Sequence, residues 1–465
     1  MSQIDNDTIC AIATPPGRSG VGIIRISGDG VAAVASAIIG KLPEPRFAHY
    51  SNFRDADGSI IDQGLALFFP GPNSFTGEDV LELQGHGGAQ VLTALLNRVQ
   101  SLGPRLARAG EFSERAFLNN KIDLLQAEAI ADLIDASSEQ ARRSAMRTLQ
   151  GEFSRQIHSL VAAITAIRVN VEAAIDFSDE DIDVMSDTGV GTAIQDSLAA
   201  LQTIFERAEQ GALLKEGINV VIAGQPNAGK SSLLNTLSGQ DSAIVTEIAG
   251  TTRDLLRQEI NLNGLPIHVT DTAGLRDSDD PVEQEGVRRA RAAMTQADQI
   301  LLVVDSNQTE NWAEQLSVLA LDELSDENAK SVLRRTTLIA NKIDLRPGVE
   351  PHMQSTDYQG VTLSVIHLSA QQQLGIELLI SRLQDLVGFT ANEEGVFVAR
   401  KRHLDALASA HNYLNTAAGG VSNHAPLELI AEDLRLTQRE LGQITGEVSS
   451  DDLLGEIFSN FCVGK

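Results

Sequence analysis

The spacing of apolar residues changes along the chain and divides it into regions of different predicted structure. Near the amino end, β-like runs at 8–13 and 21–26 are separated by a turn-rich segment, and a third run at 79–84 precedes Gly85-His86-Gly87-Gly88. Short apolar runs bounded by turn residues are typical of strands. We therefore predict a mixed α+β domain over residues 1–120.

From Lys121 onward the apolar spacing becomes three and four residues, which is typical of amphipathic helices. The stripes comprise Ile122, Leu125, Ala129 and Leu133, then Ile157, Leu160, Val161, Ile164, Ile167, Val171 and Ile175, then Leu404, Leu407, His411 and Leu414, and finally Leu427, Ile430, Leu434, Leu441 and Ile444. We interpret His411 as a helix-packing histidine. Because such stripes must be buried, we predict one discontinuous all-α domain of residues 121–215 and 390–465.

The segment 216–388, inserted between the two helical parts, has a third pattern. Its strand-like runs at 220–223, 265–270, 337–340 and 365–368 each end in a polar or Gly-containing motif. Buried strands followed by loops that carry chemistry are typical of an α/β nucleotide-binding domain. The predicted fold class is therefore multidomain, with an inserted α/β P-loop domain of the Ras-like type.

The first motif, Gly224 to Ser231, has the pattern Gly, four residues, Gly-Lys-Ser. Such a loop directs backbone N–H groups at phosphates, places an ammonium near the β and γ oxygens, and offers a hydroxyl to Mg²⁺. We therefore predict nucleotide binding here, with Ser231 as a Mg²⁺ ligand. The predicted contacts in this loop are Asn227, Ala228, Gly229, Lys230, Ser231 and Ser232.

Three further motifs follow in the order that a guanine-nucleotide domain requires. Asp271-Thr272-Ala273-Gly274 would approach Mg²⁺ and the γ-phosphate, and Ser369-Ala370 would complete the base pocket. In Asn341-Lys342-Ile343-Asp344, the aspartate can accept two hydrogen bonds from the N1–H and N2–H₂ edge of guanine, which adenine lacks. Guanine is therefore the predicted base.

Between the first two motifs lies a predicted switch segment, Thr246-Glu247-Ile248-Ala249-Gly250-Thr251-Thr252-Arg253-Asp254. In this segment Thr252 would reach Mg²⁺. Position 275 is a leucine, whereas a Ras-like GTPase carries a water-orienting glutamine there. A leucine side chain forms no hydrogen bond, so another group must orient the attacking water.

Asn227, Gly250-Thr251-Thr252-Arg253-Asp254, Asp271 to Leu275 and the terminal Phe461-Cys462-Val463-Gly464-Lys465 together resemble the MnmE (TrmE) family of tRNA modification GTPases. The likeness runs along essentially the whole chain. It implies a GTPase that is activated by dimerisation of its GTPase domains and by K⁺, a fixed cation that would stabilise transition-state charge. The implied K⁺ ligands are Asn227, Thr246, Ile248 and Thr251, and the implied catalytic groups are Lys230 and the water-orienting Glu283.

The residues alone leave alternatives to these roles. Without the resemblance, Glu283 fits an ordinary solvated acid in an acidic segment, and Glu285 is near enough to be confused with it. For the amino-terminal domain the resemblance implies a folate-binding fold that mediates dimerisation and holds a tetrahydrofolate derivative, in its 5-formyl or methylene form. The matching positions are Arg25, Glu82, Lys121 and Lys465. The resemblance also implies that Cys462 lies at the site of the reaction, and the alternative is that its side chain only packs against its neighbours.

Composition limits the partners. Acidic residues outnumber basic ones 63 to 36, giving a net charge of −27, so a basic RNA-binding surface must be local if it exists. Arg400-Lys401-Arg402-His403 and the group Arg142, Arg143 and Arg147 are candidates, and solvated helix faces explain either equally well. The two cysteines predict no disulfide framework and a cytoplasmic location, and the apolar runs predict no membrane span.

Two functions from different classes fit these observations. The resemblance implies a homodimeric GTPase that, with an FAD-dependent partner protein, adds an aminomethyl-type group to C5 of the wobble uridine of certain tRNAs, with one carbon from tetrahydrofolate. The alternative is a GTP-switched RNA or ribosome assembly factor whose flanking domains only bind. That alternative predicts no folate and a basic RNA-binding module such as a KH domain, which the sequence does not show.

Overall fold

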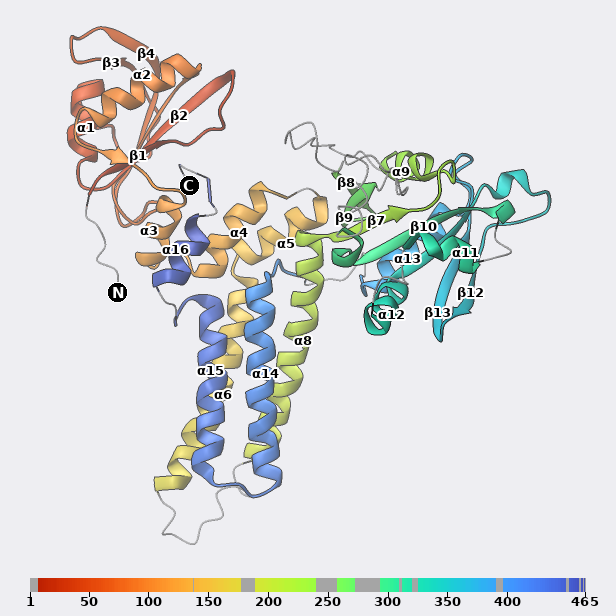
Figure 1. Ribbon diagram of the computed structural model, residues 1–465. Coiled ribbons are helices and arrows are strands. Elements are labelled where there is room, and N and C mark those ends of the chain that lie inside the picture. Colours follow the sequence, from red (N-terminus) through yellow and green to blue (C-terminus); the bar gives the residue numbers. More distant parts are fainter. Residues whose placement is uncertain are drawn as a thin grey trace. The chain divides into compact units, whose positions relative to one another are not determined.

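The computed structural model describes residues 7–136, 138–176, 189–239, 257–271, 293–308, 312–319, 325–389, 396–448, 451–459, 461–462 and 464. It divides into two compact units (Figure 1). Unit 1 comprises residues 1–135, 145–204 and 405–465, and unit 2 comprises 136–144 and 205–404. Unit 1 is therefore built from segments on both sides of unit 2 in the sequence. The domain boundaries expected from the sequence stay predictions.

The amino-terminal part of unit 1 is a six-stranded sheet with the order β3-β4-β5-β2-β1-β6. Its elements are β1 (Ile9–Ile12), β2 (Ser19–Ser27), α1 (Val31–Ile39), β3 (His49–Arg54), β4 (Ile60–Phe69), β5 (Val80–Gly87), α2 (Ala89–Gln100) and β6 (Arg105–Leu106). The three strand-like runs expected from the sequence correspond to β1, β2 and β5, which confirms the α+β prediction.

Residue alternation gives this sheet two different faces. Leu81 and Leu83 of β5 are fully buried in one core with side chains of α1 and α2, so both helices cover that face. Glu82 and Gln84 alternate with these leucines along β5 and point to the other face, because successive strand residues alternate. Arg25 of β2 is the direct cross-strand neighbour of Glu82. The pleat therefore leaves a polar row on the face opposite the helices.

A buried ionic cluster lies where the sheet meets α3 (Glu111–Leu118). Arg115 donates to Asp7, Glu78 and Glu111, and Arg105 donates to Asp7 and Glu111. The side chains of Arg115 and Glu111 are only 4% and 2% exposed. Burial acts to raise the pKa of Glu111, but hydrogen bonds from Arg105, the Arg108 backbone and Arg115 hold this pKa at about 2. The cluster thus joins the start of the chain, the sheet and α3.

The rest of unit 1 is helical. Its elements are α4 (Leu124–Ile134), α6 (Glu152–Asp176), α14 (Lys401–Ser422), α15 (Leu427–Thr445), α16 (Asp451–Ser459) and the first part of α8 (Val190–Glu216), while α5 (Glu139–Leu149) spans the boundary between the units. Gln438 of α15 donates to Thr165 of α6 and accepts from Arg168. The α6, α8, α14 and α15 helices run side by side (Figure 1). Helices from both flanking segments therefore pack together, as their stripes predict.

One helical stripe lies differently from the prediction. On α14 the buried positions include His403, Ala406, Leu407, Ala410 and Leu414, whereas Leu404 and His411 are only partly buried. The buried histidine of this helix is therefore His403, and its Nδ1 accepts from the backbone N–H of Arg400 at 3.0 Å, next to the helix start. The buried face of α14 therefore differs from the predicted stripe. The small side chains of Ala406 and Ala410 face the neighbouring helices, whereas the larger Leu404 and His411 are only partly covered.

The α6 helix is the one helix among the described residues that is long and apolar enough to cross a membrane, with a mean hydropathy of 1.3. Its fully buried side chains, Phe153, Ile157, Ile164 and Val171, recur at helical spacing. The buried core helix of a bundle meets the same criteria of length and composition.

Unit 2 is a seven-stranded sheet with the order β12-β13-β11-β10-β7-β9-β8. Its elements are β7 (Ile218–Ala223), α9 (Lys230–Ser238), β8 (Arg257–Leu262), β9 (Leu265–Asp271), β10 (Gln299–Asp305), α11 (Trp312–Leu316), α12 (Asp326–Arg334), β11 (Thr336–Asn341), β12 (His352–Tyr358), β13 (Val361–His367) and α13 (Ile376–Leu386). The five central strands are parallel, and the edge strands β8 and β12 are antiparallel to their neighbours.

Both faces of this sheet are covered. Val220 and Ile222 of β7 join a core that includes residues of α9 and α13, while Val221 and Ala223 join a second core with α11 and α12. Strands buried on both faces read as continuous apolar runs, which is why the sequence shows them without alternation. All four strand-like runs predicted in this segment are strands, so the α/β prediction is confirmed.

The ionic cluster predicts a pH-dependent stability for the amino-terminal domain. The pKa of Glu111 is about 2, below its ordinary value of 4.5, so the carboxylate stabilises the fold above pH 4.5 and this stabilisation is lost as the pH falls toward 2. We expect Glu111→Gln to lower the free energy of unfolding by about 3 kcal/mol at pH 7 and by progressively less at lower pH. Hydrogen exchange of peptides from residues 7–120 during urea unfolding measures it, since the single tryptophan, Trp312, reports on unit 2.

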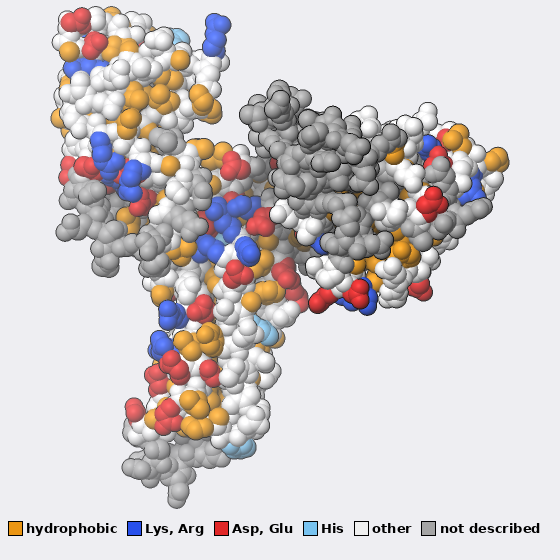
Figure 2. Space-filling model, in the orientation of Figure 1, with side chains coloured by type: hydrophobic (Ala, Val, Ile, Leu, Met, Phe, Trp, Pro, Cys, Tyr) orange, Lys and Arg blue, Asp and Glu red, His pale blue; other side chains and the backbone are white. Residues whose placement is uncertain are grey.

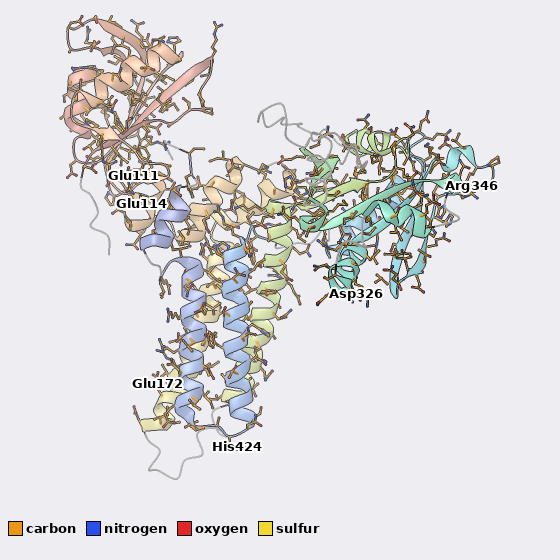
Figure 3. All side chains as sticks on the ribbon, viewed as in Figure 1. Glu111, Glu114, Glu172, Asp326, Arg346 and His424 are labelled. Carbon is orange, nitrogen blue, oxygen red and sulfur yellow. The ribbon has the colours of Figure 1, made fainter. Side chains whose placement is uncertain are left out.

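Glu114, one turn later on α3, supplies the matched control (Figure 3). Burial raises the pKa of Glu114, so its ionised form does not gain stability from the fold at neutral pH. We expect Glu114→Gln to leave the domain as stable as the unmodified protein or slightly more stable. A loss of equal size in both variants would contradict the account.

Candidate functional site

The loop between β7 and α9 has a backbone that two glycines permit. Gly224 has φ +145°, and a Cβ there would lie 2.2 Å from the Val303 carbonyl oxygen. Gly229 has φ +101°, and a Cβ there would lie 2.2 Å from Nδ2 of Asn341. Asn227, between them, also has a positive φ, +62°. The predicted phosphate loop therefore has the tight turn and close packing that its glycines imply.

Lys230 opens α9 and reaches back over this loop. Its Nζ donates to the carbonyl oxygens of Gly224 and Gln225 at 2.8 and 3.1 Å. Ser231 and Ser232 follow in the first turn of α9, where they are exposed. The amino end of a helix leaves N–H groups unpaired within the helix and carries a partial positive charge, so this loop presents an ammonium, hydroxyls and amides together.

The side chain of Asn341 joins the phosphate loop to the loop of Ser369 and Ala370, which we call the base loop. Its Nδ2 donates to the Ala228 carbonyl oxygen and its Oδ1 accepts from the Ala370 N–H, both at 2.9 Å. Asn341 is only 2% exposed, at the carboxyl end of β11. Three of the motifs predicted from the sequence are therefore brought together by one amide group.

Asp344 and Ser369 form the next part of the predicted base pocket. The Ser369 hydroxyl donates to Asp344 Oδ1 at 2.5 Å, which orients the carboxylate. Thr236 of α9 donates to the Ala370 carbonyl oxygen at 2.8 Å and so anchors the loop to the helix after the phosphate loop. No sequence motif indicates Thr236, because its role depends on how α9 packs.

Several predicted positions lie outside the described residues. Asp271 ends β9 next to Ile222 of β7, at the sheet edge where the phosphate loop begins. The predicted positions outside the described part of the chain are Thr246, Glu247, Ile248, Ala249, Gly250, Thr251, Thr252, Thr272, Ala273, Gly274, Leu275, Glu283 and Lys465. Their roles, like those of the other named site residues, stay predictions.

The second candidate site lies on the polar face of the six-stranded sheet. Arg25 and Glu82 form an ion pair in which Nη2 and Oε1 are 2.9 Å apart. The Arg25 guanidinium lies 5.9 and 5.7 Å from the ring centres of Phe75 and Phe112. Gln84 donates to the other oxygen of Glu82 at 3.1 Å. Sequence reasoning missed Phe75, Phe112 and Gln84, since tertiary packing alone brings the two rings to Arg25.

The carboxyl-terminal tail reaches this pair. Arg25 Nη1 donates to the Gly464 carbonyl oxygen at 3.3 Å, and the Gly110 N–H donates to that of Cys462 at 3.4 Å. Gly464 has φ +98°, and a Cβ there would lie 2.5 Å from the Ile12 carbonyl oxygen. Cys462 itself is exposed. Two of the predicted folate positions and the described part of the tail thus lie together.

Lys121 has a different environment. It is exposed, and its Nζ donates to the Pro72 carbonyl oxygen at 2.8 Å. Pro72 belongs to the same β4–β5 loop as Phe75, which packs against Arg25. This loop connects Lys121 to the Arg25 pair, and the predicted role of Lys121 stays a prediction.

The two basic groups noted in the sequence also have partners. Figure 2 shows basic and acidic side chains close together in the region of α5. On α5 both Arg142 and Arg143 pair with Glu139, at 2.7 and 2.8 Å. In the second group His403 is buried at the start of α14. The role of either basic group stays a prediction.

The parallel sheet covered by helices on both faces, the glycine loop before α9 and the joined base loop define unit 2 as the nucleotide-binding domain of a P-loop GTPase. The comparisons with known proteins agree. The family model of the MnmE helical domain matches residues 124–462, and the family model of the GTP-binding protein TrmE N-terminus matches residues 8–121.

The curated relatives extend over the whole chain. The tRNA modification GTPase MnmE of Hydrogenovibrio crunogenus is 54% identical over 99% of both chains, and that of Coxiella burnetii is 53% identical over 100% of both. Among solved structures, the G domain of the T. maritima FeoB iron transporter is 23% identical and covers 36% of this chain and 98% of its own, with a TM-score of 0.26. The chain belongs to the MnmE family of tRNA modification GTPases.

Proposed function

We propose that this chain hydrolyses GTP in order to modify C5 of the wobble uridine of certain tRNAs, adding a carboxymethylaminomethyl or aminomethyl group. It would act as a cytoplasmic homodimer with an FAD-dependent partner protein and take one carbon from a tetrahydrofolate derivative in its 5-formyl or methylene form. Membership of the MnmE family supports the tRNA role. The observation that carries the GTPase part is the Asn341 amide, which links a phosphate loop to a loop suited to guanine.

In the proposed GTPase site each described residue has a defined task. The ammonium of Lys230 and the amides before α9 bind the β and γ oxygens, and the Asp344 carboxylate accepts from the guanine edge. Ser231 is exposed in the first helical turn, where its hydroxyl fits Mg²⁺, with Thr252 as the second protein ligand. Bound Mg²⁺ and K⁺ supply positive charge beside the phosphates.

Potassium would bind through Asn227 and the segment of Thr246, Ile248 and Thr251. The exposed amide of Asn227 at the tip of the phosphate loop fits this role, since its oxygen suits a hard cation. Glu283 would orient the attacking water in place of the glutamine that Leu275 replaces. Dimerisation of the GTPase domains would complete this arrangement.

For folate the proposal rests on the Arg25–Glu82 pair. A pterin ring presents a planar amino-pyrimidinone edge that a carboxylate can bind through two hydrogen bonds, and its glutamate tail suits a cation. Glu82 is 14% exposed and already held by Arg25 and Gln84, so little of its freedom would be lost on binding. Lys121 and Lys465 would supply further cations for the glutamate tail, and Cys462 would lie at the site of the reaction.

The potassium role predicts salt-specific hydrolysis. We expect GTP hydrolysis to be about tenfold faster or more in KCl than in NaCl at equal ionic strength, because one fixed transition-state charge contributes at least that much. Phosphate release under single-turnover conditions measures it. In Asn227→Ala the two salts should give the same slow rate while GDP still binds, and equal rates in the unmodified protein would remove the potassium role.

The folate role separates the modification enzyme from an assembly factor. We expect the purified protein to bind 5-formyl-tetrahydrofolate, and Arg25→Ala to weaken this binding about tenfold or more, since a charge-assisted contact is lost. Isothermal titration calorimetry measures both. The control is Arg54→Ala, which removes an arginine of β3 that donates to the Gly58 carbonyl oxygen. Absence of any folate binding by the unmodified protein would favour the assembly factor.

A further inference from the structure

Asp305, a residue outside the predicted motifs, lies beside the loop after β11, which carries the Asn341-Lys342-Ile343-Asp344 motif. It is the last residue of β10, and in the parallel pairing of β10 with β11 it is the register partner of Asn341. The next residue along β11 is Lys342, whose Nζ lies 2.9 Å from Asp305 Oδ2. The topology thus presents a carboxylate to the lysine of the Asn341-Lys342-Ile343-Asp344 motif.

The second oxygen of Asp305 is also bound. Oδ1 accepts from the backbone N–H and from Nδ2 of Asn307, both at 3.0 Å. Partial burial acts to raise the pKa of Asp305, but hydrogen bonds from Asn307 and Lys342 keep this pKa below its ordinary value. Asp305 is therefore a charged and fixed acceptor, whose orientation is set before any ligand arrives.

A second contact joins the end of β10 to the loop after β11. Arg346 Nη1 donates to the Ser306 carbonyl oxygen at 2.8 Å. Figure 3 labels Arg346 in unit 2. Lys342 itself has a left-handed backbone, φ +68°, which is unfavourable for a lysine and persists only where its surroundings hold it. The last residue of β10 and the residue after it therefore hold the loop after β11 at Lys342 and at Arg346.

We propose that Asp305 is a positioning residue for guanine-nucleotide binding and that it acts through Lys342. The inference rests on the proposed guanine site. A free lysine side chain loses rotamer entropy when its stem packs against a ligand. Because Asp305 fixes the ammonium, the Lys342 stem stays extended beside the pocket formed by Asn341 and Asp344. The nucleotide then meets an ordered surface, and less entropy is lost when it binds.

Asp305→Asn tests the proposal, because it keeps the shape of the side chain and removes its charge. We expect about tenfold weaker GDP binding, the size expected for one charge-assisted hydrogen bond. Fluorescence titration with a methylanthraniloyl-labelled GDP measures it, alongside the unfolding temperature. The matched control is Asp357→Asn, which removes an equal charge at the Thr362 end of the β12–β13 hairpin, opposite the base loop.

Two further readouts distinguish positioning from general damage. IDP lacks the 2-amino group that Asp344 would bind, so Asp305→Asn should weaken GDP and IDP by the same factor and leave their ratio unchanged. In a Lys342→Met background, Asp305→Asn should cause no further loss, because the two residues act as one unit.

Each outcome bears on a separate claim. If the unmodified protein binds neither nucleotide, the proposed guanine site fails. If it binds GDP but Asp305→Asn matches Asp357→Asn, only the positioning role fails. An undiminished tenfold loss in the Lys342→Met background, or a changed GDP-to-IDP ratio, would also overturn the proposal, since Asp305 would then act by another route.

Discussion

The GTPase unit depends on the buried amide of Asn341. This side chain accepts from Ala370 and donates to Ala228, so it satisfies one group in the base loop and one in the phosphate loop. Without it, two buried backbone groups would lose their partners, at about 1–3 kcal/mol each. The glycine at 229 follows from the same contact, since a Cβ there would lie 2.2 Å from the amide nitrogen. The geometry of one hydrogen-bonding group thus constrains the sequence of another loop.

The amino-terminal site is built by a different principle. Its ion pair consists of cross-strand neighbours, Arg25 and Glu82, but its surroundings come from α3, the β4–β5 loop and the tail. The buried cluster around Arg115 and Glu111 holds α3 against the sheet, and Phe112 of α3 lies against Arg25. The stability of the domain and the shape of the candidate folate site therefore share one ionic cluster.

The sequence predicted most of the fold because its patterns are local. Strand runs, helical stripes and the glycine loop each depend on neighbouring residues, and the structure confirms them. The order of the four motifs also predicted which loops would meet, because parallel strands place their carboxyl ends at one edge. The buried positions of α14 differ from the predicted stripe, since periodicity alone does not distinguish a large residue from an alanine that faces a neighbouring helix.

The supporting residues could not be predicted in this way. Asp305 ends an apolar strand and belongs to no motif, and the strand order places it beside Lys342. Phe75 and Phe112 are far apart in the sequence and meet at Arg25 through tertiary packing. Residues that hold a functional group in position are specified by topology, whereas those that touch the ligand carry a recognisable spacing.

In the proposed function, GTP turnover at the phosphate loop is required for tRNA modification. The most direct measurement is mass spectrometry of wobble uridine in tRNA from cells whose own gene is replaced by one encoding Lys230→Ala, compared with the unmodified chain and with the exposed-lysine control Lys41→Ala. We expect loss of the C5 modification only in Lys230→Ala, with the protein present at normal abundance. Full modification in those cells would contradict it.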